Sequence, residues 1–299
     1  MKYYAGIDIG GTRIKMGIIN EAGKLCVSEN EATAVEREAL MKQVHDFLLR
    51  HLKYPIAAVG ISTPGIVRED GYMQTSGAIK CFFHRNMKKE FEAYLKLPVV
   101  VENDGKAAAC AEKWLGAAKH IRNFVCLTLG TAIGGAIYIN GQCYRGLGGL
   151  AGEFGVSLIG NQKGNYDEQS FAYHAATVAG LCRQYSYRIH ERVLDAQEIF
   201  NRAKQGDEIA QDCLQAFYHS VAVLCMNVGV TIAPEVIFIG GGISSNEDIM
   251  RNIVEAYQQI CNDYHVLRLV DMPRIQLCDF HNQAGMLGAV APLIKGISI

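Results

Sequence analysis

The chain has 299 residues, of which 49% are hydrophobic and 20% charged, and its formal net charge is -1. These values are typical of a soluble globular protein that is long enough for two domains. Because lysine and arginine are scattered along the chain, no binding to nucleic acid or to an anionic membrane is expected. The first residues fit neither a signal peptide nor a membrane span, so we expect a cytoplasmic protein.

The ten cysteines are spaced too widely for a zinc or redox motif, because no two of them form a CxxC pair. Most lie in apolar stretches such as FVCLTLG, where a reduced cysteine packs as a small hydrophobic side chain. We therefore expect buried thiols in place of disulfides or a metal site.

The first motif is a β-hairpin with a glycine-rich tip, predicted from strands at residues 4–8 and 14–19. Its tip consists of Gly10, Gly11 and Thr12. Glycine has no Cβ, so backbone N–H groups at such a tip can approach a phosphate closely. Asp8, just before the tip, is placed to bind a magnesium ion directly or through water.

Helical spacing then predicts a helix over residues 36–52, with a buried stripe of Leu40, Val44, Phe47, Leu48 and His51. A strand at 56–62 ends in the turn Thr63-Pro64-Gly65, and a helix is expected over 85–95.

A short buried strand at 98–101 leads through Asn103 and Asp104 into a helix over 107–114. In α/β folds a carboxylate at the carboxyl end of a strand is often where the chemistry takes place. Asp and Asn are also favoured helix caps, so the residues alone leave both roles open for Asp104.

Residues 125–143 repeat the plan of the first hairpin, with Gly130 and Thr131 at the turn and a second strand at 136–139. The repeat suggests duplicated halves, each with one phosphate-facing hairpin. Two unrelated hairpins are the alternative, since the identity is confined to the tips.

The glycine-rich segment 146–155 carries one acid, Glu153. Its GLGGLA letters match a dinucleotide fingerprint, but the flanking turn and strand do not fit that motif. Glu153 is therefore either a ligand-binding carboxylate or a solvated loop acid.

The remaining helices are predicted at 173–188, 195–202, 207–232 and 283–295, with a short strand at 275–278. A strand at 236–239 is followed by three glycines and then by a helix for which Ser244 and Glu247 have capping-box spacing. A strand, glycines and a helix amino terminus together suit the phosphate or adenosine of a nucleotide.

In this order and spacing the motifs resemble the ROK sugar kinases of the actin and hexokinase ATPase superfamily, over essentially the whole chain. The matching motifs are DIGGT at 8–12, STPG at 62–65, ENDG at 102–105, LGTAIGGAI at 129–137, AGEFG at 151–155 and IGGGI at 239–243. The resemblance implies an α/β, actin-like and ribonuclease H-like ATPase fold of two lobes around a cleft, with duplicated phosphate-binding hairpins. The smaller lobe would contain residues 1–117 and 284–299, and the larger lobe 118–283.

The resemblance also implies ATP and Mg²⁺ as partners, a small-molecule sugar as substrate, and a homodimer. Asp104 falls where the family keeps its general base. The positions at or near those that hold sugar hydroxyls are Ser76, Gly77, Asn103 and Glu153. The positions that would face the nucleotide phosphates are Gly10, Gly11, Thr12, Gly130 and Thr131, with Asp8 at the metal and Gly241 and Gly242 at the adenosine.

Two departures from the family pattern concern zinc and the sugar. Zinc-containing members have GEIGH, whose His binds zinc and a sugar hydroxyl, and here Val156 takes that place. Their cysteine-rich segment is replaced by GNQKGNYDEQSFAYH from Gly160, so no structural zinc is expected. The family's final Glu aligns with Gln169 or, after a shift of one residue, with Glu168.

The missing His and Glu normally contact the anomeric end of the hexose, so their loss leaves room for an aglycone. GAIK at 77–80 and GEFG at 152–155 resemble bacterial β-glucoside kinases, which phosphorylate the 6-hydroxyl of a cellobiose-type sugar. The alternatives are a glucokinase or an N-acetylmannosamine kinase of the same family. A non-catalytic sugar-binding regulator is an alternative of a different class, although the first phosphate motif begins at Asp8 and a preceding DNA-binding domain is not expected.

Overall fold

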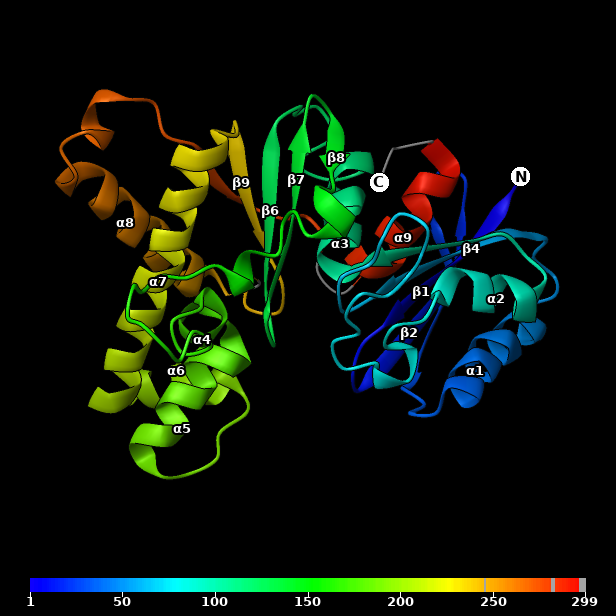
Figure 1. Cartoon of the computed structure of the whole chain (residues 1–299), viewed down its shortest axis with the longest axis horizontal. Coiled ribbons are helices and arrows are strands. Elements are labelled where there is room, and N and C mark those ends of the chain that lie inside the picture. The colour runs from blue at the N-terminus through cyan, green and yellow to red at the C-terminus, as the bar shows by residue number, and fades with distance from the viewer. Residues whose placement is uncertain (245, 281–282, 296–299) are drawn as a thin grey trace. The chain divides into compact units, whose positions relative to one another are not determined.

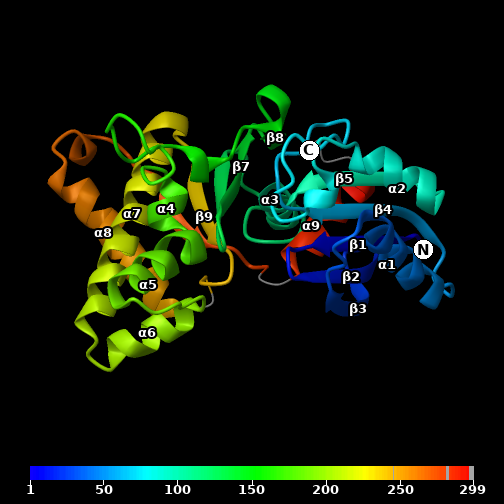
Figure 2. The same ribbon diagram turned by 60° about the horizontal axis from the view of Figure 1, so that its bottom comes forward.

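The computed structural model describes residues 1–244, 246–280 and 283–295, which form two compact units (Figures 1 and 2). The first unit contains Met1–Arg122, Ala136–Gly152 and the described residues 283–295. The second contains Asn123–Gly135 and the described residues between Glu153 and Phe280. The lobe boundaries expected from the sequence, 1–117 with 284–299 against 118–283, stay a prediction.

Each unit is built from strands and helices in alternation. The first part of the chain forms β1 (Tyr3–Ile9), β2 (Arg13–Asn20), β3 (Leu25–Ala32), α1 (Arg37–Arg50), β4 (Ile56–Thr63), α2 (Met87–Leu95), β5 (Val99–Asn103) and α3 (Asp104–Trp114). The middle forms β6 (Phe124–Leu129), β7 (Ile133–Ile139), β8 (Gln142–Tyr144), α4 (Phe171–Ala175), α5 (Arg183–Ile189), α6 (Ala196–Lys204) and α7 (Glu208–Ile232). The last part forms β9 (Val236–Gly240), α8 (Glu247–Asp263), β10 (Arg274–Leu277) and α9 (Ala284–Lys295).

The two sheets have the same topology, which confirms the duplicated halves predicted from the repeat. One sheet has the order β3-β2-β1-β4-β5, and the other has β8-β7-β6-β9-β10 when it is read in the same sense. The pairs β2–β3 and β7–β8 are antiparallel, whereas β1–β4, β4–β5, β6–β9 and β9–β10 are parallel. The glycine tips 10–12 and 130–132 therefore occupy equivalent positions in the two sheets.

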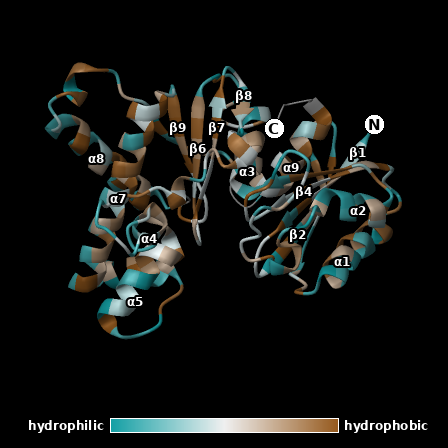
Figure 3. Ribbon diagram, in the orientation of Figure 1, coloured by the Kyte–Doolittle hydropathy of each residue, from teal (hydrophilic) through white to brown (hydrophobic). Residues whose placement is uncertain are grey.

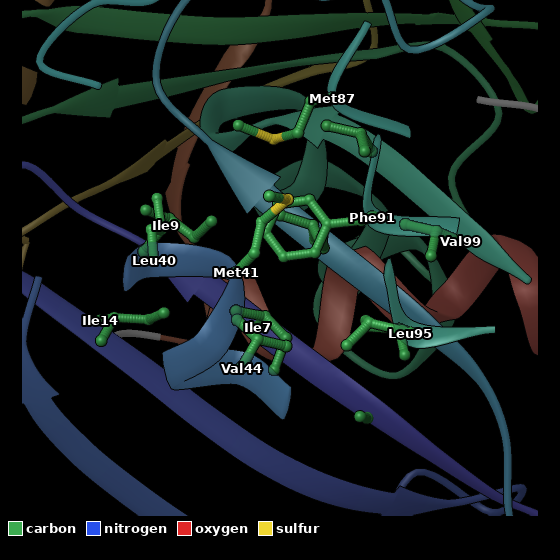
Figure 4. Packing of buried hydrophobic residues seen from close by; sticks show 14 of the residues in the cluster. Ile7, Ile9, Ile14, Leu40, Met41, Val44, Met87, Phe91, Leu95 and Val99 are labelled. Atoms are coloured by element: carbon green, nitrogen blue, oxygen red, sulfur yellow. The ribbon is translucent and has the colours of Figure 1, made fainter. Parts of the chain in front are cut away.

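One face of the first sheet is covered by α1 and α2 (Figure 4). Figure 4 labels the buried side chains that meet there: Ile7, Ile9, Ile14, Leu40, Met41, Val44, Met87, Phe91, Leu95 and Val99. Four members of the stripe expected for the first helix, all except His51, are in this core. The spacing of the apolar residues was therefore sufficient to predict which face of α1 is buried.

On its other side the first sheet meets α9, and α9 also lies beside α3 (Figure 1). Glycines make these contacts very close. A Cβ at Gly60 would lie 2.1 Å from the carbonyl oxygen of Ala289, and a Cβ at Gly288 would lie 1.6 Å from that of Ala107. Backbone therefore packs directly on backbone at α9.

Two predictions for the second half were wrong. The helix expected over 173–188 is broken at Ala176, whose extended backbone separates α4 from a π-helical turn at Thr177–Cys182 and from α5. The break lets the N–H of Thr177 donate to the carbonyl of Gly130 at 2.9 Å. The capping box expected at Ser244 is absent as well, because Asn246 caps α8 through the N–H groups of its first turn.

Within the described residues, α7 has the length and mean hydropathy, 1.4, of a membrane span. However, 61% of its most apolar stretch is buried inside the protein. Figure 3 colours the residues of this helix by their hydropathy. A mostly buried helix of this kind is typical of the core of a folded unit.

The contact between α9 and α3 makes a prediction about stability. Gly288→Ala should lower the free energy of unfolding by about 3 kcal/mol, because its Cβ has no room beside Ala107. Without the clash the same change would stabilise a helix by about 1 kcal/mol. Urea denaturation followed by circular dichroism measures the difference.

The matched control is Gly229→Ala in α7, where the nearest atoms to a new Cβ are the flexible end of Met272 at 3.0 Å and the ring of Pro273 at 3.2 Å, and no backbone carbonyl lies closer. It should change the free energy of unfolding by less than about 1 kcal/mol. A Gly288→Ala variant as stable as the wild-type protein would contradict the packing described for α9.

Candidate active site

Asp8 lies near the end of β1, between β2 and β4. Its register partners are Lys15 on β2 and Ser62 on β4. Ser62 Oγ donates to Asp8 Oδ1 at 3.0 Å, and Lys15 Nζ lies 3.5 Å from Asp8 Oδ2. The ammonium group of Lys15 therefore lies beside this carboxylate.

Behind Asp8 is the first turn of α9. A Cβ at Gly285 would lie only 2.4 Å from Asp8 Cγ, so the carboxyl group needs a glycine at this position. The amino-terminal end of a helix favours a nearby carboxylate. Gly285 was not among the sequence predictions, because its neighbour lies far away along the chain.

The tip of the first hairpin contacts the loop that follows β4. The tip is closed by the N–H of Gly10, which donates to the carbonyl of Arg13 at 2.9 Å, and Thr33 Oγ1 donates to the carbonyl of Gly10 at 2.7 Å. A Cβ at Gly11 would lie 2.6 Å from Cβ of Ala78. Gly11 and Thr12 are exposed at the tip.

Ser76 and Gly77 are held in this loop by its contact with the turn after β4. Gly65 and Gly77 have φ of +105° and +50°, and a Cβ at Gly77 would lie 2.9 Å from Cβ of Pro64. Ser76 Oγ and Thr63 Oγ1 are buried and have no hydrogen-bond partner within the described part of the chain. A buried hydroxyl without a protein partner is suited to bond an ordered water or a ligand.

Asn103 and Asp104 divide two roles between them. Asn103, not Asp104, caps α3, since its Oδ1 accepts from the N–H of Lys106 at 3.1 Å. Asn103 Nδ2 donates to the carbonyl of Gly65 at 2.9 Å and to Asp104 Oδ1 at 3.1 Å. Asp104 is exposed in the first turn, and its Oδ1 also accepts from the N–H of Gly105 at 2.8 Å.

In the first unit, successive contacts link the hairpin tip, the loop of Ser76 and Gly77, and the pair Asn103 and Asp104. The hairpin tip contacts Ala78, the 75–77 loop packs on Gly65, and Gly65 is bonded to Asn103. A phosphate-type tip, a loop with a buried hydroxyl and an oriented carboxylate are therefore joined by successive contacts.

In the second unit, Gly130 and Thr131 lie against the π-helical turn, where the N–H of Ala179 donates to the carbonyl of Thr131 at 3.1 Å. Gly241 has φ of +98°, and its Cβ would lie 2.2 Å from the carbonyl oxygen of Leu129, so only glycine fits there. Around Gly242 and Gly130 a new Cβ would meet open space.

These glycines line a cavity of about 280 Å³ in the second unit. Its walls include Gly130, Thr131, Thr177, Phe200, Gly242 and Asn246. Thr177 Oγ1 is buried and has no hydrogen-bond partner among the described residues. Thr177 was not predicted from the sequence, because the expected helix placed it inside a regular element.

Glu153 and Gln169 belong to a folded-back segment of the second unit. Glu153 is half-buried directly before the short 3₁₀ turn Phe154–Val156, and Val156 is 68% exposed. Gln169 Oε1 accepts from the N–H of Gln162 at 2.7 Å, and its Nε2 donates to the carbonyls of Gln162 and Gly164. The amide of Gln169 therefore closes its own loop, and its contact with a sugar stays a prediction.

The alternative acid, Glu168, is held through its backbone. His174 Nε2 lies 2.8 Å from the carbonyl oxygen of Glu168.

Among residues 1–244, 246–280 and 283–295, no group of three or more His, Cys, Asp or Glu side chains is arranged to hold a metal ion. The ten cysteines are free thiols.

The loop closed by Gln169 makes a second prediction. Gln169→Ala should speed proteolysis and amide exchange within residues 160–169 by about tenfold, because three hydrogen bonds are lost at once. Gln162→Ala is the matched control, since Gln169 uses only the backbone of Gln162. Equal protection of the loop in both variants would contradict the role given to Gln169. Hydrogen exchange followed by mass spectrometry measures the protection of residues 160–169 in both variants.

Comparison with known proteins places this geometry in a family. The model of the ROK family matches residues 4–295. A β-glucoside kinase of Listeria monocytogenes is 31% identical over 291 residues, which cover 96% of this chain and 95% of that protein. A glucokinase of Halalkalibacterium halodurans is 28% identical over 313 residues, with 96% and 93% covered.

Among solved structures, a ROK family protein of Streptococcus pneumoniae in complex with sucrose matches with a TM-score of 0.87. It is 27% identical, and the match covers 98% of both chains. The α/β fold with two equivalent sheets is thus the actin-like ATPase fold of these proteins, as the sequence motifs predicted. This chain belongs to the ROK family and is a sugar kinase of that family.

Proposed function

We propose that this kinase transfers the γ-phosphoryl group of ATP to the 6-hydroxyl of a hexose unit, in a β-glucoside such as cellobiose. The observation that carries the proposal is the continuous set of contacts in the first unit. It runs from the Gly11 tip through Ala78 and Gly65 to Asn103 and Asp104. Phosphoryl transfer requires little more than a positioned hydroxyl, charge neutralisation and a proton acceptor.

Asp104 is the proposed general base. It is exposed, as a group that must reach a substrate hydroxyl has to be. Two donors, Asn103 Nδ2 and the N–H of Gly105, fix the direction of its carboxylate. A carboxylate held in this way can accept the proton of the attacking hydroxyl while the hydroxyl oxygen bonds to the γ-phosphorus and the bond from that phosphorus to the bridging oxygen breaks, which releases ADP.

The sugar is held by polar groups that surround this carboxylate or belong to the second unit. Ser76 Oγ supplies a buried hydroxyl that has no partner within the described chain. Asn103 Oδ1 has a second lone pair beyond the one used in the cap, and it can accept from a sugar hydroxyl. Gly77 allows the sugar to approach the backbone closely. Glu153 is proposed as a further sugar ligand, and so is Gln169 or, after a shift of one residue, Glu168.

The nucleotide is proposed to lie along the glycine tips. Gly10, Gly11 and Thr12 of one hairpin and Gly130 and Thr131 of the other would contact phosphates through backbone N–H groups. The cavity lined by Gly242 is the proposed site for adenosine. The residue Gly241 holds the turn that shapes it.

The residues around Asp8 fit a magnesium ion. Mg²⁺ is commonly bound through one or two carboxylates together with substrate phosphates and water, so a single carboxylate with a neighbouring hydroxyl is a suitable donor set. When bound, the ion neutralises charge on the phosphates. Asp8, oriented by Ser62, would hold it directly or through water.

The β-glucoside assignment is supported by the relatives and by the loop of the second unit. A β-glucoside kinase is 31% identical to this chain, and a family member has been solved with the disaccharide sucrose. Val156 is exposed where zinc-containing members have a His, and it can make no hydrogen bond to a sugar through its side chain. An aglycone would fill the space that such a contact normally takes.

The second candidate is a kinase for a free hexose or for N-acetylmannosamine, and it is favoured by the similarity to a glucokinase. We also propose a cytoplasmic homodimer without nucleic acid or membrane partners, as the family resemblance implies. A non-catalytic sugar-binding regulator would have the same fold but no need for an oriented carboxylate at Asp104.

Asp104→Asn tests the kinase mechanism. The amide cannot accept the proton, so kcat should fall by about 10³-fold or more, within the range that general-base catalysis supplies together with positioning. ATP binding, measured by calorimetry, should remain within about threefold of wild type. Unchanged kcat in this variant would contradict the assignment of Asp104 as the general base.

A comparison of sugars tests the substrate class. Initial rates with cellobiose, glucose and N-acetylmannosamine, measured by coupled ADP release, should give the highest kcat/KM for cellobiose. An advantage of about tenfold corresponds to one or two extra contacts with the second ring. Activity on the monosaccharides alone would overturn the β-glucoside assignment and leave the kinase mechanism intact.

A further inference from the structure

Next to the Asn103–Asp104 pair lies a buried ionic cluster that the proposed mechanism does not use. Glu102 and Lys106 are completely buried, and only 12% of the Arg145 side chain is exposed. Arg145 Nη1 donates to Glu102 Oε2, and Lys106 Nζ donates to the carbonyl of Gly149 at 2.9 Å. All three side chains belong to the first unit.

The cluster reaches the catalytic pair through the backbone. The N–H of Asn103 donates to Glu102 Oε1 at 2.7 Å, so the carboxylate that pairs with Arg145 also holds the backbone of the residue before Asp104. Lys106 in turn donates its own N–H to Asn103 Oδ1. The residue Asn103 is therefore held on its backbone by Glu102 and on its side chain by the backbone of Lys106.

The same cluster fastens the glycine-rich loop. Arg145 Nη2 donates to the carbonyl of Val67 at 3.3 Å, and Gln74 Nε2 donates to the carbonyl of Gly148 at 2.7 Å. Together with the bond from Lys106 to Gly149, these contacts fix the segment 145–149. In the sequence this segment leads directly to Glu153.

Burial of these charges works against stability. Burial raises the pKa of Glu102, while Arg145, the N–H of Asn103 and Lys106 act in the opposite direction. A buried ion pair is often no more stabilising than apolar side chains of the same size. Stability alone is therefore a weak reason for an ionic cluster at this position.

We propose that the Glu102–Arg145 pair is a positioning device for catalysis, which sets the direction of the Asp104 carboxylate by fixing the peptide of Asn103. Glu102 and Arg145 are positioning residues, since neither is proposed to touch the substrate. The inference rests on the proposed function, because it requires Asp104 to be the general base.

The test is a mutant cycle that crosses the pair with Asp104. Glu102→Gln/Arg145→Met removes both charges of the pair, keeps the bond from Lys106 to the carbonyl of Gly149, and keeps an oxygen acceptor for the N–H of Asn103. We measure kcat, both KM values and the melting temperature with and without Asp104→Asn. With Asp104 present, kcat should fall about 30-fold with both KM values within about threefold, since a small misalignment can cost up to about 100-fold.

In the Asp104→Asn background the same double change should reduce the residual kcat by less than about threefold, because there is no base left to align. Equal losses in both backgrounds would show a structural role and overturn the inference. A rise in KM with unchanged kcat would overturn it as well. The matched control is Glu29→Gln/Arg50→Met, which removes a surface pair of the same unit and should leave kcat unchanged.

Arg145→Lys covers the case in which the double variant does not fold. Lys keeps the charge but cannot donate to both Glu102 and Val67 as the guanidinium group does. With Asp104 present, kcat should therefore fall by about fivefold, and in the Asp104→Asn background it should stay nearly unchanged. A loss of the same size without Asp104 would contradict the proposal. Wild-type activity and its collapse in Asp104→Asn are measured first, so failure of the proposed function is recognised separately.

Discussion

The approach of α9 to the first sheet and to α3 is the constraint on which the candidate site depends. Gly60 and Gly288 let the backbone of α9 pack on β4 and α3 without intervening side chains. The same helix places Gly285 against the Asp8 carboxyl group. One helix thus fixes both the strand that carries the proposed metal ligand and the helix that begins at the proposed base. Backbone contacts of this kind leave little freedom for relative movement, which suits a reaction that depends on alignment.

Duplication explains why the two units offer different groups on equivalent frames. Both sheets present a glycine tip between their central strand and its hairpin partner. In the first sheet the strand before the tip carries Asp8 near its end, whereas the equivalent strand of the second sheet, Phe124–Leu129, carries no acid. The second unit instead has Gly241 and the cavity lined by Gly242. Both halves therefore offer backbone N–H groups at a glycine tip, but they differ in the side chains beside it.

The sequence predicted the features that depend on neighbours along the chain. The spacing of apolar residues predicted α1 and the strands of the two hairpins, and glycines marked their tips. Capping preferences predicted the junction of strand and helix at Asp104. The strand β3 was missed, because its exposed, acidic stretch LCVSENEA has too few apolar residues to signal an edge strand. The break at Ala176 was missed because it serves the distant carbonyl of Gly130. Gly285 escaped notice for the same reason, since its partner Asp8 lies at the other end of the chain.

The junction after β5 shows how one pair of residues satisfies two requirements. A helix that begins at a catalytic carboxylate still needs a cap, and a carboxylate used as the cap would turn its oxygens toward the helix N–H groups. Here Asn103 supplies the cap, so the direction of Asp104 can be set by Asn103 Nδ2 and by its own first turn. The bond from Asn103 to Gly65 then ties this arrangement to the loop of Ser76. The sequence left capping and catalysis as alternatives for one residue. In the structure Asn103 is the cap, and the catalytic role of Asp104 is the step that the kinase proposal adds.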